Sequence, residues 1–189
     1  MLEIIEEELR FLKEKHATPR RTAIGTAADA ELNEIDLTAN ERSIIIKSAD
    51  GYVKRLLLEE FDEQNRGTRG KAGMANLLDS DAVVQLFTCS SHDTILCISQ
   101  RGVAYALPAY KVPATSRSAR GVTFQQLLPI DEQDRIETVL PVSEFSESIF
   151  LVLLTQRGWI KKTPLEAFKQ ISARGLIAVS LEEGDSVVR

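Results

Sequence analysis

A pattern that recurs about every 50 residues constrains the fold of this chain more than any other feature of its sequence. In each copy an apolar run leads into a turn that contains a glycine, at Gly51, Gly102 and Gly158. Glycine readily adopts the positive φ that tight hairpin turns require, and a β-branched or aromatic residue follows each of these glycines. Each copy of the pattern therefore predicts a β-hairpin.

A loop follows each predicted hairpin and ends in an Arg-Gly pair. The pairs are Arg69-Gly70, Arg120-Gly121 and Arg174-Gly175. A period of this size, with about four strands, is typical of the blades of propeller-type folds, and one blade cannot bury its own sheet faces. We therefore expect an all-β, propeller-like β-pinwheel of four-stranded antiparallel blades, in units 20–78, 79–130 and 131–189. The last unit stops within an expected strand, which predicts a longer array of blades.

Residues 1–19, ahead of the blades, predict an α-helix. Its apolar residues recur at spacings of three and four and fall on one face, which is the pattern of an amphipathic helix. They are Leu2, Ile5, Leu9 and Leu12. Pro19 ends the pattern, because proline cannot continue a helix. We expect the apolar face of this helix to pack on a partner outside the blades.

Composition narrows the class of protein further. The apolar share is 43%, the first residues are acidic, unlike a signal peptide, and no run of about 18 apolar residues could span a membrane. We therefore expect a soluble, cytoplasmic protein. Cys89 and Cys97 lie in apolar runs and are expected to be buried free thiols. With His92 between them they still lack the four ligands of a structural zinc site, so no metal is predicted.

The net charge of −5 is unevenly distributed along the chain. Acidic residues recur at the turns between blades, where a solvated role is expected, whereas lysine and arginine gather on the hairpins and loops. A basic rim attracts a polyanion through its local field and binds the backbone of duplex DNA with little sequence preference, bending it. For any single cluster, a solvated face is the alternative interpretation. The candidate DNA-binding residues of these clusters are Lys54, Arg55, Lys111, Arg117, Arg120, Lys161, Lys162 and Arg174.

The densest basic loop lies in the first unit. Its candidate DNA-binding residues are Gln64, Asn65, Arg66, Gly67, Thr68, Arg69, Gly70 and Lys71. A nucleotide-binding loop needs a buried strand before it, and the acidic segment 58–63 is no such strand; a glycine-rich surface turn is the other interpretation. The loop resembles the gyrase-A box, Gln-Arg-Arg-Gly-Gly-Lys-Gly, of the C-terminal domains of the DNA gyrase A family. Four positions match, Arg69 replaces a lysine, and Asn65 and Thr68 depart from the box.

The resemblance extends over the whole chain, and residues 1–22 resemble the last helix of that family's catalytic core. It implies blades that exchange strands and a duplex that wraps around the basic rim, so that the intact ATP-dependent enzyme introduces negative supercoils. The implied partners are double-stranded DNA, the rest of gyrase A and gyrase B in an A2B2 heterotetramer, without a membrane. No cofactor is implied for this chain, whereas ATP and magnesium are implied for other domains. The implied location is the bacterial nucleoid or an organelle of bacterial ancestry.

The family's DNA-cleaving tyrosine is implied to lie upstream, and none of Tyr52, Tyr105 or Tyr110 has a similar context. The sequence offers no nucleophile with a base beside it, so we predict no catalytic residue in this chain. Two alternatives remain open. The departures from the box keep the C-terminal domain of the topoisomerase IV counterpart of gyrase A in view, because that domain has a degenerate box or none. A protein-binding propeller would need apolar loop tips, where this chain has Arg, Lys, Gly, Ser and Thr.

Overall fold

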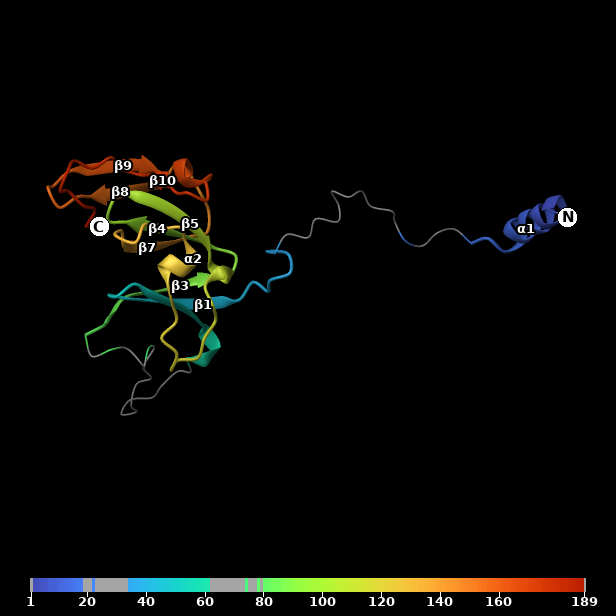
Figure 1. Ribbon diagram of the computed structural model, residues 1–189, viewed down its shortest axis with the longest axis horizontal. Helices are drawn as coiled ribbons and strands as arrows, with labels where there is room; N and C mark the ends of the chain where they lie inside the picture. Colours follow the sequence, from blue (N-terminus) through green and yellow to red (C-terminus); the bar gives the residue numbers. More distant parts are fainter. Residues whose placement is uncertain are drawn as a thin grey trace. The chain divides into compact units, whose positions relative to one another are not determined.

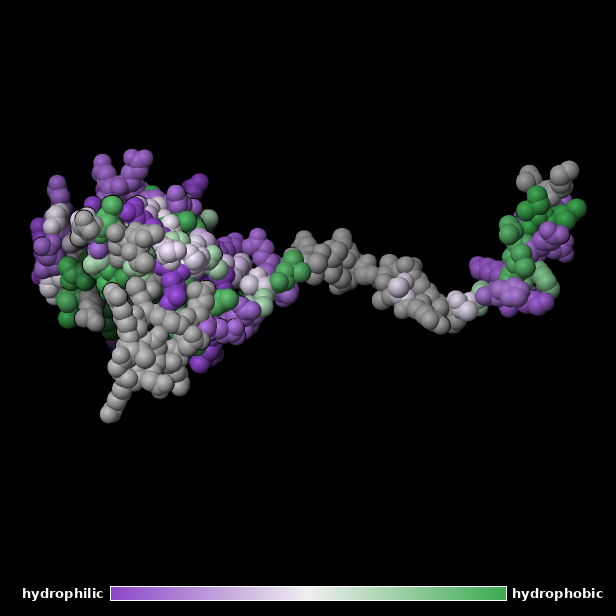
Figure 2. All heavy atoms as spheres, turned by 90° about the horizontal axis from the view of Figure 1, so that it is seen from below, coloured by the Kyte–Doolittle hydropathy of each residue, from purple (hydrophilic) through white to green (hydrophobic). Residues whose placement is uncertain are grey.

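A computed structural model describes residues 2–18, 22, 34–61, 74, 78 and 80–188, which divide into the units Met1–Leu37 and Thr38–Arg189. The first unit contains α1, Leu2–His16, whose range agrees with the predicted helix. Figure 2 shows green apolar side chains uncovered beside purple polar ones on this helix, and Leu9 and Phe11 are each 60% exposed. No helix in the described part of the chain has the length and apolarity to cross a membrane.

In the described part of the second unit, three hairpins follow one another (Figure 1). Two four-stranded antiparallel sheets have the orders β3-β1-β2-β6 and β10-β5-β4-β7, and a third sheet consists of β8 and β9. The strands are β1 Arg42–Ser48, β2 Tyr52–Leu57, β3 Val83–Ser90, β4 Thr94–Ser99, β5 Val103–Pro108, β6 Val122–Thr123, β7 Ile136–Val142, β8 Phe150–Leu154, β9 Ile160–Pro164 and β10 Leu176–Ile177. Short helices are η2 Leu58–Glu60, η3 Ala109–Lys111, α2 Phe124–Leu127 and η4 Leu165–Phe168. The predicted all-β fold of antiparallel blades is confirmed.

Each four-stranded sheet takes its strands from more than one repeat. The hairpin β1–β2 supplies the centre of the first sheet, β3 extends it on one side, and the two-residue strand β6 returns from beyond the second hairpin to pair with β2. In the second sheet β7 pairs with β4, and β10 returns from beyond the third hairpin to pair with β5. The units 20–78, 79–130 and 131–189 therefore stay a prediction about where the sequence repeats. Their boundaries differ from those of the sheets, because each four-stranded sheet includes strands from more than one unit.

The core lies between consecutive sheets, because the inner strands are covered on both faces. Along β4, Ile95 and Cys97 face the first sheet's cluster, whereas Leu96 and Ile98 belong to the cluster shared with the third hairpin. Successive side chains of a strand point to opposite faces, so a strand buried on both faces is apolar without alternation. Cys89 and Cys97 are buried free thiols, as expected from their apolar surroundings.

Glycine turns close the three hairpins as predicted. Gly51, Gly102 and Gly158 have φ of 86°, 80° and 88°, which confirms their equivalence. Each turn is also held by a hydroxyl, from the last residue of β1 and of β4 and from the residue directly after β8. The acceptor and donor pairs are Ser48 Oγ with Tyr52 N, Ser99 Oγ with Val103 N, and Thr155 Oγ1 with Trp159 N, each at 3.2 Å.

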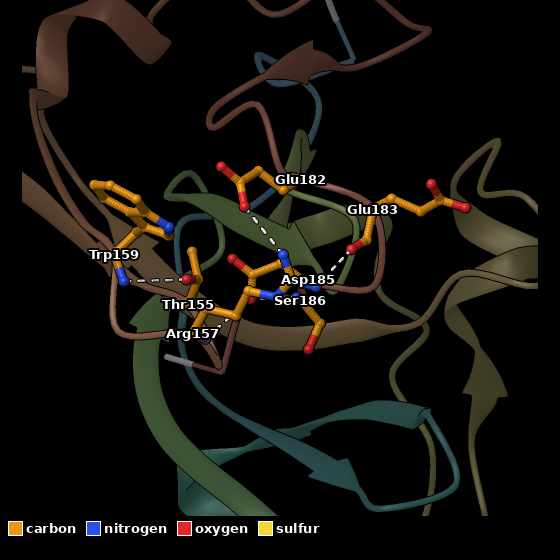
Figure 3. Close-up of polar contacts among 7 residues, drawn as sticks. All are labelled: Thr155, Arg157, Trp159, Glu182, Glu183, Asp185 and Ser186. Carbon is orange, nitrogen blue, oxygen red and sulfur yellow. Dashed lines mark hydrogen bonds and ion pairs between the residues drawn. The ribbon is translucent and has the colours of Figure 1, made fainter.

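A carboxylate from a segment 28 to 33 residues further along the chain binds each turn as well. Asp81, Asp134 and Asp185 accept a hydrogen bond from the backbone N–H that precedes the turn glycine, at 3.0, 3.2 and 3.1 Å. Figure 3 shows the third of these, where Asp185 lies against the backbone of Arg157. The expectation that the acidic residues at these turns are merely solvated is wrong for all three, since Asp81 and Asp134 are buried and Asp185 is half-buried.

We predict that Asp81→Asn lowers the free energy of unfolding at pH 7 by about 1 kcal/mol, because the amide keeps the acceptor oxygen but loses the charge. Burial raises the pKa of Asp81, but hydrogen bonds from the Asp50 amide, the Ser48 hydroxyl and the Ala82 amide outweigh it and lower the pKa below its ordinary value of 3.8. The contribution is therefore complete above about pH 4 and is lost as the pH falls through the lowered pKa. Urea unfolding from pH 7 to pH 3 measures it.

The matched control is Glu132→Gln, which neutralises an exposed carboxylate at the next turn. It should leave the free energy of unfolding within about 0.5 kcal/mol of the parent chain. A difference between Asp81→Asn and the parent that stays constant down to pH 3 would contradict the assignment.

Candidate nucleic-acid interface

Two equivalent segments carry arginines along the outer edge of the sheets. We call residues 112–123, from the end of η3 to the end of β6, the first arm, and residues 169–177, from the end of η4 to the end of β10, the second arm. Each arm crosses back to the preceding hairpin and lies against its second strand. Just beyond each arm the chain bonds the turn glycine of that hairpin, through Phe124 N to Gly51 O at 3.2 Å and Ala178 N to Gly102 O at 2.8 Å.

The Arg-Gly pairs occupy the same place on the two arms. Gly121 and Gly175 have φ of 92° and 88°. A Cβ on Gly121 would lie 2.4 Å from the carbonyl oxygen of Val53, and one on Gly175 would lie 2.7 Å from Val103 Cγ1. Glycine is needed at both positions for its conformation and for the close approach of the arm to the neighbouring strand. The arginine that precedes each glycine therefore lies at the same position of the rim in both arms.

Arg120 lies over an aromatic ring of the preceding hairpin. Its guanidinium carbon is 4.9 Å from the ring centroid of Tyr52, and Nη1 donates to the hydroxyl of Tyr52 at 3.3 Å. Arg117 and Arg120 are half-buried, whereas Lys111 and Arg174 are exposed. The ring orients Arg120 while leaving part of its donor fork at the surface, as phosphate binding requires.

Lys54 does not lie at the surface, where a residue that contacts DNA must lie. Its side chain is fully buried under the first arm, and Nζ donates to the carbonyl oxygens of Ser116, Arg117 and Ala119 at 3.1, 2.9 and 2.8 Å. An ammonium that is enclosed in this way cannot reach a phosphate. We therefore remove Lys54 from the candidate DNA-contacting residues.

Arg55 is also directed into the protein. Its Nε donates to the carbonyl oxygen of Val112 at 3.1 Å, and Nη1 lies within 3.5 Å of the hydroxyls of Ser43 and Ser91. The backbone of Arg55 bonds the first arm in both directions, to Pro113 and Thr115. Arg55 therefore secures the start of the arm, and it is half-buried.

The third hairpin presents its lysines on β9. Lys161 and Lys162 are exposed, and the Nζ of Lys161 donates to the carbonyl oxygen of Ala178 at 2.6 Å. The Nζ of Lys162 lies 3.9 Å from the centroid of the Phe150 ring. Both lysines belong to the strand that corresponds to β2 and β5, and the bond to Ala178 places the ammonium of Lys161 beside the end of the second arm.

The predicted box falls outside the described residues. This applies to Gln64, Asn65, Arg66, Gly67, Thr68, Arg69, Gly70 and Lys71. Their assignment as DNA-binding residues stays a prediction.

Basic residues at two of the hairpin turns are neutralised, which was not foreseen from the sequence. Arg157 pairs with Glu182 at 3.0 Å and donates to the carbonyl oxygen of Glu183 at 2.8 Å (Figure 3). Arg101 occupies the same turn position and lies 3.6 Å from Asp131. The signal that could have revealed these pairs is the acidic turn that recurs in each repeat. Among the described residues, the arginines of the arms and the lysines of β9 therefore remain candidates for a cationic surface, whereas the arginines of these two turns face carboxylates.

Blades that exchange a strand with their neighbours, and that carry arginine on the exchanged segment, define a propeller-type domain with a basic rim. A family model described as "DNA gyrase C-terminal domain, beta-propeller" matches residues 43–90, 93–143 and 150–189. The chain belongs to this family, which confirms the resemblance found in the sequence.

Similar proteins agree with this assignment. The DNA gyrase A protein of Synechocystis sp. is 48% identical over 97% of this chain and 21% of its own length. The chloroplastic/mitochondrial DNA gyrase A protein of Arabidopsis thaliana is 38% identical over 99% of this chain and 20% of its own length. The chain thus spans about a fifth of the length of these relatives.

Solved structures share the fold. The C-terminal domain of DNA topoisomerase IV has a TM-score of 0.64 at 24% identity, over 80% of this chain and 45% of that one. A DNA gyrase A C-terminal domain has a TM-score of 0.58, also at 24% identity, over 78% of this chain and 46% of that one. At this identity the likeness establishes the β-pinwheel architecture.

Replacing two glycines by alanine tests the seating of the first arm. Gly121→Ala and Gly158→Ala both force alanine into a positive φ, but a Cβ at residue 158 meets nothing within 4 Å. We expect Gly121→Ala to lower the free energy of unfolding by at least about 1 kcal/mol more than Gly158→Ala does, because it also separates the arm from Val53. Chemical denaturation measures both variants. Equal losses would contradict the close contact between the arm and β2.

Proposed function

We propose that this chain is the DNA-wrapping domain of a gyrase A protein, which binds duplex DNA through its phosphates and bends it around the basic rim. The observation that carries the proposal is the repeated placement of Arg120 and Arg174. Each precedes a glycine of positive φ and lies on an arm that crosses to the preceding hairpin. Because the arginine recurs from one blade to the next, the blades would present cations at intervals along one path. A bent DNA duplex could follow such a path with its phosphates.

The chemistry of the arms supports phosphate binding over base recognition. The first arm supplies Arg117 and Arg120 with the hydroxyls of Ser116 and Ser118, and Lys111 precedes it. Guanidinium groups meet phosphate oxygens through two parallel hydrogen bonds, and hydroxyls add further donors. The described arms contain the two-residue strands β6 and β10 and no helix, so they offer no regular element that would enter the major groove. Binding therefore depends little on sequence.

In the full-length protein, we propose that the wrapped duplex is presented to the cleavage core, so that strand passage introduces negative supercoils. Cleavage, ATP and magnesium belong to other domains and to gyrase B in an A2B2 assembly, at the nucleoid of a bacterium or in a plastid or mitochondrion. Names of relatives support gyrase over topoisomerase IV, since a gyrase A protein is 48% identical over 97% of the chain. The protein-binding scaffold is disfavoured because the described arms are polar and cationic.

The chain should bind duplex DNA despite its net charge of −5. If about four to six phosphates are neutralised, log affinity should fall with log salt with a slope of roughly −4 to −5. Arg117→Ala with Arg120→Ala should remove about two contacts and reduce the magnitude of the slope by about two, equally on unrelated sequences. Fluorescence anisotropy at several salt concentrations measures this.

Arg101→Ala with Arg157→Ala is the matched control, because it also removes two charges, from hairpin turns where the arginines already face Asp131 and Glu182. Its salt slope should equal that of the parent chain. Salt-independent binding, or equal slopes for the control and the arm variant, would refute the proposed rim.

The box should have a role that the other rim residues do not share. In the full-length enzyme with gyrase B, replacing Arg66 and Arg69 by alanine should abolish negative supercoiling and leave relaxation intact, because cleavage resides elsewhere. Replacing Arg117 and Arg120 should leave partial supercoiling. Topology gels at matched DNA occupancy distinguish the two variants. Equal supercoiling by both variants would mean that the box contributes no more than the other charged residues of the rim.

A further inference from the structure

A buried lysine connects the strand of one hairpin to the arm of the next. Lys54 lies on β2, its side chain has no exposed surface, and its ammonium donates to three carbonyl oxygens within four residues of the first arm. Those carbonyls belong to Ser116, Arg117 and Ala119, and Arg120 follows directly. The Cβ of Lys54 also lies 2.9 Å from where a Cβ on Gly121 would stand.

We infer that Lys54 is a positioning residue for DNA binding, which fixes the first arm so that Arg117 and Arg120 face the rim. This inference rests on the DNA-binding function proposed above. Three carbonyl oxygens that converge on one point repel each other, and a central ammonium with three N–H donors satisfies all of them. Without that ammonium the carbonyls would turn outward to water, and the turn of chain that bears the two arginines would lose its shape.

The ammonium has a larger effect than its hydrogen bonds alone, because it restricts the arm before DNA arrives. An arm that is already ordered loses less conformational entropy when phosphate binds to its arginines. Beside it, Arg55 bonds Val112, and Tyr52 holds the guanidinium of Arg120. Three side chains of β2, from Arg55, Lys54 and Tyr52, thus fix the start, the middle and the end of the first arm.

The corresponding residues of the other hairpins provide a matched comparison. Counting from the turn glycines, Lys54 corresponds to Tyr105 and Lys161. Tyr105 is buried against Gly175 of the second arm, with its Cε1 atom 2.8 Å from where a Cβ on that glycine would stand. Lys161 is exposed on β9. Lys161→Met therefore removes the same charge from the same strand position without removing the contact to the first arm.

Limited trypsin digestion of the full chain tests the inference without DNA. Trypsin cleaves after arginine, and in the parent chain the bonds after Arg117 and Arg120 should be protected by the ordered arm. Lys54→Met should raise the cleavage rate at these two bonds by about tenfold or more, relative to the bond after Arg135, through local opening. Lys54→Gln, which keeps a smaller donor, should give an intermediate rate. Lys161→Met should leave the rates unchanged.

A double-mutant cycle, with DNA affinity as the readout, tests whether Lys54 acts on DNA binding through the two arginines of the first arm. Lys54→Met should weaken binding of a duplex by about fivefold to tenfold in the parent chain and by less than about twofold in a chain that already carries Arg117→Ala and Arg120→Ala. That dependence distinguishes positioning from a general loss of fold, which would weaken binding by the same factor in both backgrounds.

Unchanged cleavage after Arg117 and Arg120 in both Lys54 variants, or an equal loss of affinity in both backgrounds, overturns the inference. If Lys54→Met does not fold, Lys54→Gln carries both measurements. If the parent chain fails to bind DNA, the proposed function fails, and the trypsin result still shows whether Lys54 holds the arm.

Discussion

The open edge of the second strand in each hairpin is the constraint on which the rest of this structure depends. β2 and β5 would each expose a row of unpaired N–H and C=O groups, and each is closed by a short strand that returns from the following repeat. Edges that stay open invite pairing with other chains, so closing them stabilises the monomeric fold. The segments that close them are the arms, and the same arms carry the arginines of the proposed DNA surface. Folding and the proposed function therefore share one element.

Location decides what each basic side chain contributes. Lys54 and Arg55 are neighbours on β2 and both bind carbonyl oxygens of the first arm, whereas Arg174 is exposed on the second arm. Arg157 is paired with the acidic turn that follows it in sequence. A carbonyl, a carboxylate and a phosphate all accept the same donors, so residue type alone does not distinguish a structural cation from one that binds DNA. The surroundings of each group make that distinction.

Much of the fold was predictable from local patterns. Turn glycines such as Gly102, and apolar runs such as the one that became β4, correctly predicted hairpins stacked as blades, because positive φ and two-sided burial leave direct traces in sequence. The exchange of β6 and β10 between sheets left no such trace, since a two-residue strand has no periodicity. The role of Asp134 was missed for a similar reason: its partner, the backbone N–H of Arg101, is 33 residues away.

The sequence by itself determined the repeat, the hairpins, the family and the presence of arginine before a glycine in every arm. Those features are local, and backbone conformation and side-chain type fix them without reference to distant residues. Tertiary structure alone decided which cations reach the surface, because that depends on which strand an arm crosses and what it covers there. Lys54 and Lys161 show the difference, because both stand at the same position after a turn glycine. Lys54 is buried under the first arm, whereas Lys161 on β9 is exposed.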